Sequence, residues 1–276
     1  MRFVRKHLVT IVLTLVFLVG VCLLAYPSVS DWWNSMHASR AVTTYTKAVE
    51  EVTPEDYEAI LNDARAYNAS LAENPTSFEL SDEEMAVYSQ KLAVEGTDVI
   101  ASVKIDRLGV ELPIYHGTSD DSLQQGIGHF AGSSLPVGGE STHVVLVGHR
   151  GLPSAKLFTD LNLLEVGDTF SVTALGQTTW YEVDQILIVE PTELGALAIE
   201  EGEELCTLVT CTPYGVNTHR LLVRGHGVDG PSEGAYLAAD AVQIDPVLVA
   251  CVVAVPLLGV RAVGVLLAGR LRRRQR

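Results

Sequence analysis

From residue 99 to residue 228 the chain is a succession of short apolar, β-branched runs separated by Gly, Pro and Asp, and this pattern limits the fold more than any other feature. Runs of this length between turn residues predict strands, and many short strands in series predict a closed or nearly closed β-barrel. The expected fold class is therefore mainly β. The predicted strands cover residues 99–105, 108–114, 143–147, 169–174, 178–189, 205–210 and 220–224, and short helices are expected near residues 119–125 and 155–161.

Residues 31–98 are more polar and predict helices. Thr53 stands before Pro54 and two acidic residues, which favours the start of a helix because it supplies an N-cap and complements the helix dipole. Asn74 and Pro75 interrupt this pattern, and Ser81 begins another predicted helix.

The two ends of the chain predict membrane helices. Leu8–Tyr26 contains nineteen residues without a charge, and Val247–Gly269 contains twenty-three residues interrupted by Arg261. Each run is long enough to cross a bilayer as a helix, and the basic residues outside them predict that both termini are cytoplasmic. A cleaved secretory signal is the alternative for the first run, although the apolar core of such signals is usually shorter.

The charge distribution excludes one class of partner. The chain has 34 acidic and 19 basic residues, for a net charge of −15. All the acidic residues lie between Asp31 and Asp245, whereas nine of the basic residues lie in the two terminal segments. Because so acidic a middle portion repels phosphate backbones, no nucleic-acid partner is expected.

Three polar side chains stand where predicted strands end. Cys211 ends the run 205–210 and Arg220 opens the run that returns, so a hairpin would place the thiol and the guanidinium opposite each other. His149 follows the run 143–147 in a Gly-flanked loop. A thiol becomes a nucleophile as the thiolate, which a nearby cation stabilises and an adjacent base can generate. Each residue alone is more often structural or solvated, but the combination predicts a catalytic site.

The remaining cysteines suggest structural roles. Cys22 and Cys251 fall in the apolar terminal runs, and Cys206 is five residues from Cys211. Five residues of strand span roughly 16 Å, which is too far for a disulfide. Without a possible disulfide partner, Cys211 is predicted to be a free thiol. No cysteines have the spacing of a metal site, and the expected enzyme uses neither a metal nor a cofactor.

These motifs resemble those of the sortases, the membrane-bound cysteine transpeptidases of Gram-positive bacteria, and among them the pilus-assembling class C. The Thr-Leu-x-Thr-Cys motif of the family corresponds to residues 207–211, its histidine to His149 and its arginine to Arg220. Further phrases that resemble class C are residues 112–118, 134–139, 151–158 and 211–220, so the resemblance covers roughly residues 99–228.

The resemblance implies an eight-stranded sortase-type barrel and a two-step acyl transfer on a Leu-Pro-x-Thr-Gly (LPxTG) sorting signal. Cys211 would attack the carbonyl between Thr and Gly to give a thioester, while His149 would protonate the departing amine and deprotonate the incoming one. Arg220 would stabilise the oxyanion or position the peptide. The implied acceptor is a lysine of the next pilin in class C, and the amine of the cell-wall precursor in housekeeping sortases.

Other residues have less specific predicted roles. Arg150, Thr210 and Tyr214 are candidate substrate-binding residues, although a loop arginine is more often solvated and Thr210 would point away from its neighbour Cys211. The acidic connection 190–204 falls where the resemblance implies contact with the sorting signal.

A lid over the site is also implied by the resemblance to class C. Relatives carry it on an Asp-Pro-aromatic motif, which this sequence lacks, and Phe78 with Glu79 is the nearest substitute in position. An alternative is that Phe78 simply packs locally within its loop.

The sequence thus predicts five segments. Residues 1–30 form a cytoplasmic tail and signal-anchor, 31–98 an extracellular helical and candidate lid segment, 99–229 the catalytic barrel, 230–246 a linker, and 247–276 a second transmembrane helix with a basic cytoplasmic tail.

Three alternatives to pilin polymerisation remain open. The first is a sortase that anchors surface proteins to the cell-wall precursor. The second is another exported cysteine peptidase, which would hydrolyse peptides and gain nothing from an added amine. The third is a non-enzymatic membrane-anchored binding module in which Cys211 is inert.

Overall fold

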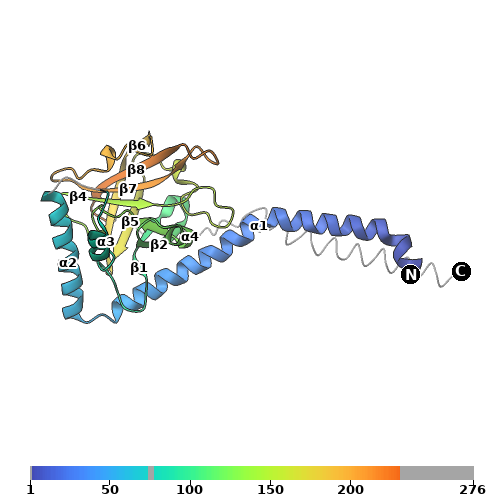
Figure 1. Ribbon diagram of the computed structural model, residues 1–276, viewed down its shortest axis with the longest axis horizontal. Helices are drawn as coiled ribbons and strands as arrows, with labels where there is room; N and C mark the ends of the chain where they lie inside the picture. The colour runs from blue at the N-terminus through green and yellow to red at the C-terminus, as the bar shows by residue number, and fades with distance from the viewer. Residues whose placement is uncertain (1, 74–77, 231–276) are drawn as a thin grey trace. The chain divides into compact units, whose positions relative to one another are not determined.

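A long N-terminal helix and a closed eight-stranded barrel are the main elements of the computed structural model, which describes residues 2–73 and 78–230 (Figure 1). The described residues divide into one unit that ends at Trp32 and another that begins at Trp33. The predicted second transmembrane helix, and all but the first residue of the predicted linker before it, lie outside the described residues.

The N-terminal helix α1 (Arg2–Glu50) contains the predicted anchor. Its apolar part begins at Leu8 and reaches a mean hydropathy of 3.0 over 18 residues, and it is the single candidate membrane span among the described residues. The helix is consistent with a membrane anchor. It does not end with the predicted anchor segment, because it runs through Pro27 and continues to Glu50.

Two further helices begin at the predicted caps. In α2 (Pro54–Glu73) the amide of Asp56 donates to Thr53 Oγ1 at 3.2 Å. In α3 (Asp82–Tyr88), Ser81 and Glu84 form a reciprocal capping box. Both helix starts were predictable from the sequence because capping depends on side chains within one turn of the helix end.

The strands close into one barrel in the order β1-β2-β3-β4-β7-β8-β6-β5, with β5 pairing β1. The pairs β2·β3 and β4·β7 are parallel and the other neighbours are antiparallel, so the barrel is mixed. The strands are β1 (Val99–Ile105), β2 (Val110–His116), β3 (Ile127–His129), β4 (Thr142–Val147), β5 (Thr169–Ala174), β6 (Gln177–Val189), β7 (Glu204–Thr212) and β8 (His219–Val228).

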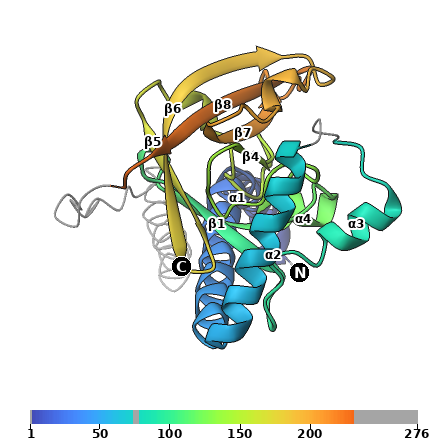
Figure 2. The same cartoon turned by 90° about the vertical axis from the view of Figure 1, so that its left-hand side faces the viewer.

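The helices α2 and α3 lie beside the barrel (Figures 1 and 2), and each of α1, α2 and α3 is joined to the barrel domain by a buried polar side chain. From α1, the Tyr45 hydroxyl donates to Ile100 O and accepts from Leu175 N, both at 2.8 Å. From α2, Asn68 forms a reciprocal pair of bonds with the backbone of Leu135. From α3, the Tyr88 hydroxyl lies 2.8 Å from Nδ1 of His129, whose pKa burial lowers to about 4. The imidazole is therefore neutral at physiological pH and serves as a structural partner.

The short elements between strands were predicted with mixed success. Helix α4 (Asp120–Gln125) forms as expected and is capped by Ser119. The helix expected near residues 155–161 is wrong, because this segment forms turns that end in the 3₁₀ helix η2 (Leu161–Leu163). The Phe158 amide donates to His149 O instead of to a carbonyl one turn earlier, and its side chain is fully buried. The apolar residues there serve loop packing, which has no helical period.

Candidate active site

Cys211 and Arg220 are directly opposite each other in the β7·β8 ladder. On β7, Cys206 and Leu208 point into the main barrel core, whereas Val209 belongs to a separate cluster on the other side of the sheet. Since side chains alternate along a strand, Cys211 shares the outer face with Val209, and Arg220 shares it with Leu222. The hairpin expected from the sequence thus places the backbone of Cys211 opposite that of Arg220.

The loop that carries His149 runs alongside the end of β7. Strand β4 is parallel to β7 with Val147 beside Val209, and the Gly148 amide continues the ladder by donating to Val209 O at 3.0 Å. The loop that carries His149 therefore begins beside the end of β7. Cys211, Arg220 and the start of the His149 loop therefore lie at the same end of neighbouring strands, and all three predicted catalytic residues are partly exposed.

Hydrogen bonds on both sides of Cys211 hold the His149 loop. Thr210 is buried, and its hydroxyl donates to Gly148 O at 2.7 Å. Arg150 donates from Nη1 to Thr212 Oγ1 at 3.0 Å, from Nε to Thr159 O and from Nη2 to Asn162 Oδ1. The polar groups of these two candidate substrate-binding residues thus bond the loop to β7 and to neighbouring segments. Thr212 and Asn162 were not singled out in the sequence, since partners of this kind depend on distant segments.

Two glycines allow this loop to lie close to its neighbours. A Cβ on Gly148 would stand 2.6 Å from the ring of Phe158, so the backbone there touches the core. Gly151 has a φ of +79°, and a Cβ there would stand 3.0 Å from the ring of Tyr214. The Tyr214 ring therefore packs against the His149 loop while remaining 61% exposed.

The electrostatic setting distinguishes the two cysteines of β7. Cys206 is fully buried, and burial raises the pKa of its thiol well above the usual value, which keeps it protonated and inert. Cys211 is a partly exposed free thiol opposite the permanent charge of Arg220. The Arg220 guanidinium donates through Nη1 to the carbonyls of Asn217 and His219, contacts that hold it at the mouth of the hairpin.

An apolar strip leads from Cys211 along the outer face of the sheet. Its buried members are Val145, Val209, Leu222 and Leu197, the last from the 3₁₀ helix η3 (Gly195–Leu197). Phe78 packs against this strip, and its ring centroid lies 5.2 Å from that of Phe130. Phe78 therefore covers apolar surface on the same face as Cys211, whereas the neighbouring candidate lid residue Glu79 is exposed.

Arg224, the other arginine on the Arg220 face of β8, is engaged elsewhere. It stands opposite Thr207, four residues along β7 from Cys211, and forms ion pairs with Asp184 and Glu200. In the described part of the chain, no group of three or more His, Cys, Asp or Glu residues is arranged to hold a metal ion.

Replacing Arg150 with alanine is expected to lower the free energy of unfolding by about 1–3 kcal/mol, because three bonds from a charged donor are lost. Thermal unfolding of Arg150→Ala, with Asn162→Ala as the variant that removes one of the three partners, measures this effect. A higher KM for peptide with unchanged stability would contradict it and would favour direct substrate binding by Arg150.

Comparisons with known proteins find similar sequences and structures. A family model described as a sortase domain matches residues 103–228. The crystal structure of sortase C1 from Streptococcus agalactiae is similar at 47% sequence identity and a TM-score of 0.67, over 70% of this chain and 100% of that one. The structure of sortase C from Streptococcus pneumoniae, reported with insights into catalysis and pilin substrate specificity, is similar at 41% identity and a TM-score of 0.63, over 69% of this chain and 97% of that one.

Sortase D of Bacillus subtilis (strain 168) is 32% identical over 113 residues, which is 41% of this chain. The match spans 54% of the length of that relative.

Proposed function

Because the chain belongs to the sortase family of cysteine transpeptidases, and solved structures 40–47% identical to it are class C sortases, we propose that it cleaves LPxTG-type sorting signals between Thr and Gly and transfers the acyl group to an amine. The observation that carries the proposal is the convergence of Cys211, Arg220 and the His149 loop at one end of neighbouring strands.

In the first step, the Cys211 thiolate adds to the Thr carbonyl and the C–N bond to Gly breaks, with His149 giving its proton to the leaving amine. The products are a thioester and a peptide that begins with Gly. In the second step the incoming amine attacks the thioester, His149 takes its proton, and the amide forms as the Cys211 thiolate leaves. Arg220 has five donors in a fixed fork, so N–H groups beyond those of Nη1 can stabilise the oxyanion or hold the peptide.

The proposed acceptor is a lysine of a pilin subunit. Its support is the similarity to Streptococcus pneumoniae sortase C, whose structure is reported together with pilin substrate specificity. The absence of an Asp-Pro-aromatic motif in the lid region favours a second candidate, transfer to the amine of a cell-wall precursor. In either case the apolar part of α1 anchors the enzyme in the membrane, and we propose that the barrel is extracellular and that both termini are cytoplasmic.

For the peptide itself, Tyr214 is the proposed contact among the three candidates. Its ring is largely exposed beside the His149 loop, whereas the polar groups of Arg150 and Thr210 bond the protein.

The test compares amines as acceptors for the full chain in detergent, with a fluorescent LPxTG peptide as donor. We expect product formation that depends on added amine, and faster transfer to a peptide that presents a lysine side chain than to an oligoglycine amine. The reverse preference would favour the wall-anchoring candidate. Hydrolysis without any gain from amines would identify an exported cysteine peptidase, and absence of a Cys211 adduct would leave only the binding module.

A further inference from the structure

The outer face of the β7·β8 pair has two polar ends joined by the apolar strip. Opposite pairs along this face are Cys211 with Arg220, Val209 with Leu222, and Thr207 with Arg224. Four residues of strand separate the ends, which is roughly 13 Å and similar to the length of about four extended peptide residues. Only the first of these pairs belongs to the proposed chemistry.

The β6–β7 connection, residues 190–203, lies on this face. Leu197 from its 3₁₀ helix is 5% exposed and packs with Val209 and Leu222, and Leu194 and Ala196 contact the same cluster. The connection is therefore attached by apolar contacts to the strip that leads to Cys211. The position of these contacts decides how much of the strip stays uncovered and can bind a ligand.

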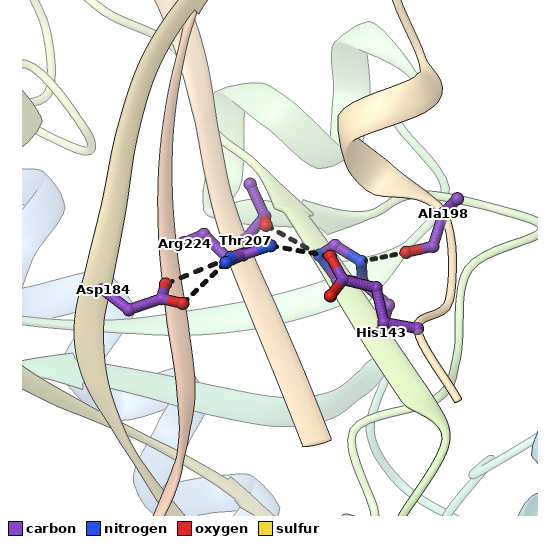
Figure 3. Close-up of polar contacts among 6 residues, drawn as sticks. His143, Asp184, Ala198, Thr207 and Arg224 are labelled. Carbon is purple, nitrogen blue, oxygen red and sulfur yellow. Dashed lines mark hydrogen bonds and ion pairs between the residues drawn. The ribbon is translucent and has the colours of Figure 1, made fainter. Parts of the chain in front are cut away.

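Arg224 joins the sheet to the far end of this connection. Its Nε and Nη2 form two bonds with the carboxylate of Asp184, at 3.1 and 2.7 Å (Figure 3). Its Nη1 donates to Glu200 Oε1 at 2.8 Å. Asp184 stands at an irregularity in the β6·β8 register. The bidentate pair orients the guanidinium, because both of its bonds lie in one plane, and the third bond then reaches the connection.

His143 of β4 provides a second attachment two residues before Glu200. Its Nδ1 lies 2.7 Å from Ala198 O and its Nε2 lies 2.7 Å from Thr207 Oγ1 (Figure 3). Burial lowers the pKa of this imidazole, so it is neutral. Since a carbonyl can only accept, Nδ1 carries the proton and donates to Ala198, and Nε2 accepts from the Thr207 hydroxyl.

We propose that Arg224 and His143 are positioning residues that hold the β6–β7 connection at Glu200 and Ala198, and so fix Leu197 as one side of the groove for the sorting peptide. The proposal rests on the function proposed above. The two attachments lie directly after the 3₁₀ helix, so loosening them shifts Leu197 along the strip without disturbing Cys211. Their effect is therefore expected on peptide binding and not on the chemical step.

The test uses Glu200→Ala in the full chain, with Glu201→Ala as the matched control. Glu200 is 54% exposed, so its removal leaves no cavity, and Glu201 is an exposed acid of the same connection. We expect Glu200→Ala to raise KM for an LPxTG peptide roughly two- to fivefold with kcat unchanged, the range of an exposed ion pair. Glu200→Gln still offers Arg224 an acceptor and should recover part of the loss.

Hydrogen exchange of residues 194–200 is measured on the same proteins, because it does not depend on activity. Exchange should be faster in Glu200→Ala than in the wild type and Glu201→Ala, while the rate of Cys211 alkylation stays the same. Unchanged exchange would overturn the attachment, and faster exchange with unchanged KM would overturn its role in binding. If the wild type transfers no peptide, the proposed function fails, and the proposed role of Arg224 and His143 in peptide binding fails with it.

Discussion

Replacing Cys211 with alanine is expected to lower kcat/KM for sorting-peptide transfer by at least about 10⁴-fold, because without the thiolate no thioester can form and the remaining groups only bind and polarise the peptide. Steady-state transfer to an amine measures the loss. Mass spectrometry of the protein with a sorting peptide should show an acyl adduct on the wild type and none on Cys211→Ala.

The matched control is Cys206→Ala, which removes the other sulfur of β7. Cys206 points into the core and its thiol is held protonated, so this variant is expected to form the adduct and to keep most of its activity. Its cost is a small loss of packing, visible as a lower Tm. Equal activity of Cys211→Ala and the wild type would eliminate the thioester mechanism. An adduct on Cys206 would show that Cys206, and not Cys211, is the nucleophile.

Replacing Arg220 with lysine is expected to lower kcat about 10²–10³-fold, although the charge is kept. An ammonium is a point charge with no planar fork, so it cannot donate to loop carbonyls and to a developing oxyanion with one fixed geometry. Separate kcat and KM values show which role dominates, because oxyanion stabilisation acts on kcat whereas peptide positioning also raises KM.

Arg107→Lys is the matched control, because it makes the same arginine-to-lysine replacement away from the candidate active site. Arg107 is 43% exposed and pairs with Asp168 and Glu165 on the surface, where a lysine keeps most of the interaction. Its kinetics should match the wild type. Turnover of Arg220→Lys close to that of Arg107→Lys would show that the guanidinium fork has no part in catalysis.

Features set by short-range patterns were predictable. The strand β1 follows from a short apolar run that is buried almost throughout, and the caps at Thr53 and Ser81 follow from side chains within one turn. The strand β3 was not predicted, because its three residues carry no period and it exists only as a bridge between β2 and β4. The wrong helix near residues 155–161 has the same origin, since the burial of Phe158 belongs to a loop.

The sequence by itself predicted the chemistry, because the types and order of Cys211, Arg220 and His149 resemble one family, and it determined the hairpin that sets the first two residues opposite each other, because that hairpin is local. Only the tertiary structure decided that the loop carrying His149 begins beside the strand that carries Cys211. The parallel pairing of β4 with β7 brings Gly148, at the start of the His149 loop, within a hydrogen bond of Thr210, which is 62 residues further along the chain. Parallel strands are joined by long crossovers, and no local pattern encodes their register. The attachment of the β6–β7 connection by Arg224 and His143 depends on the same pairing, since it joins four strands and a loop.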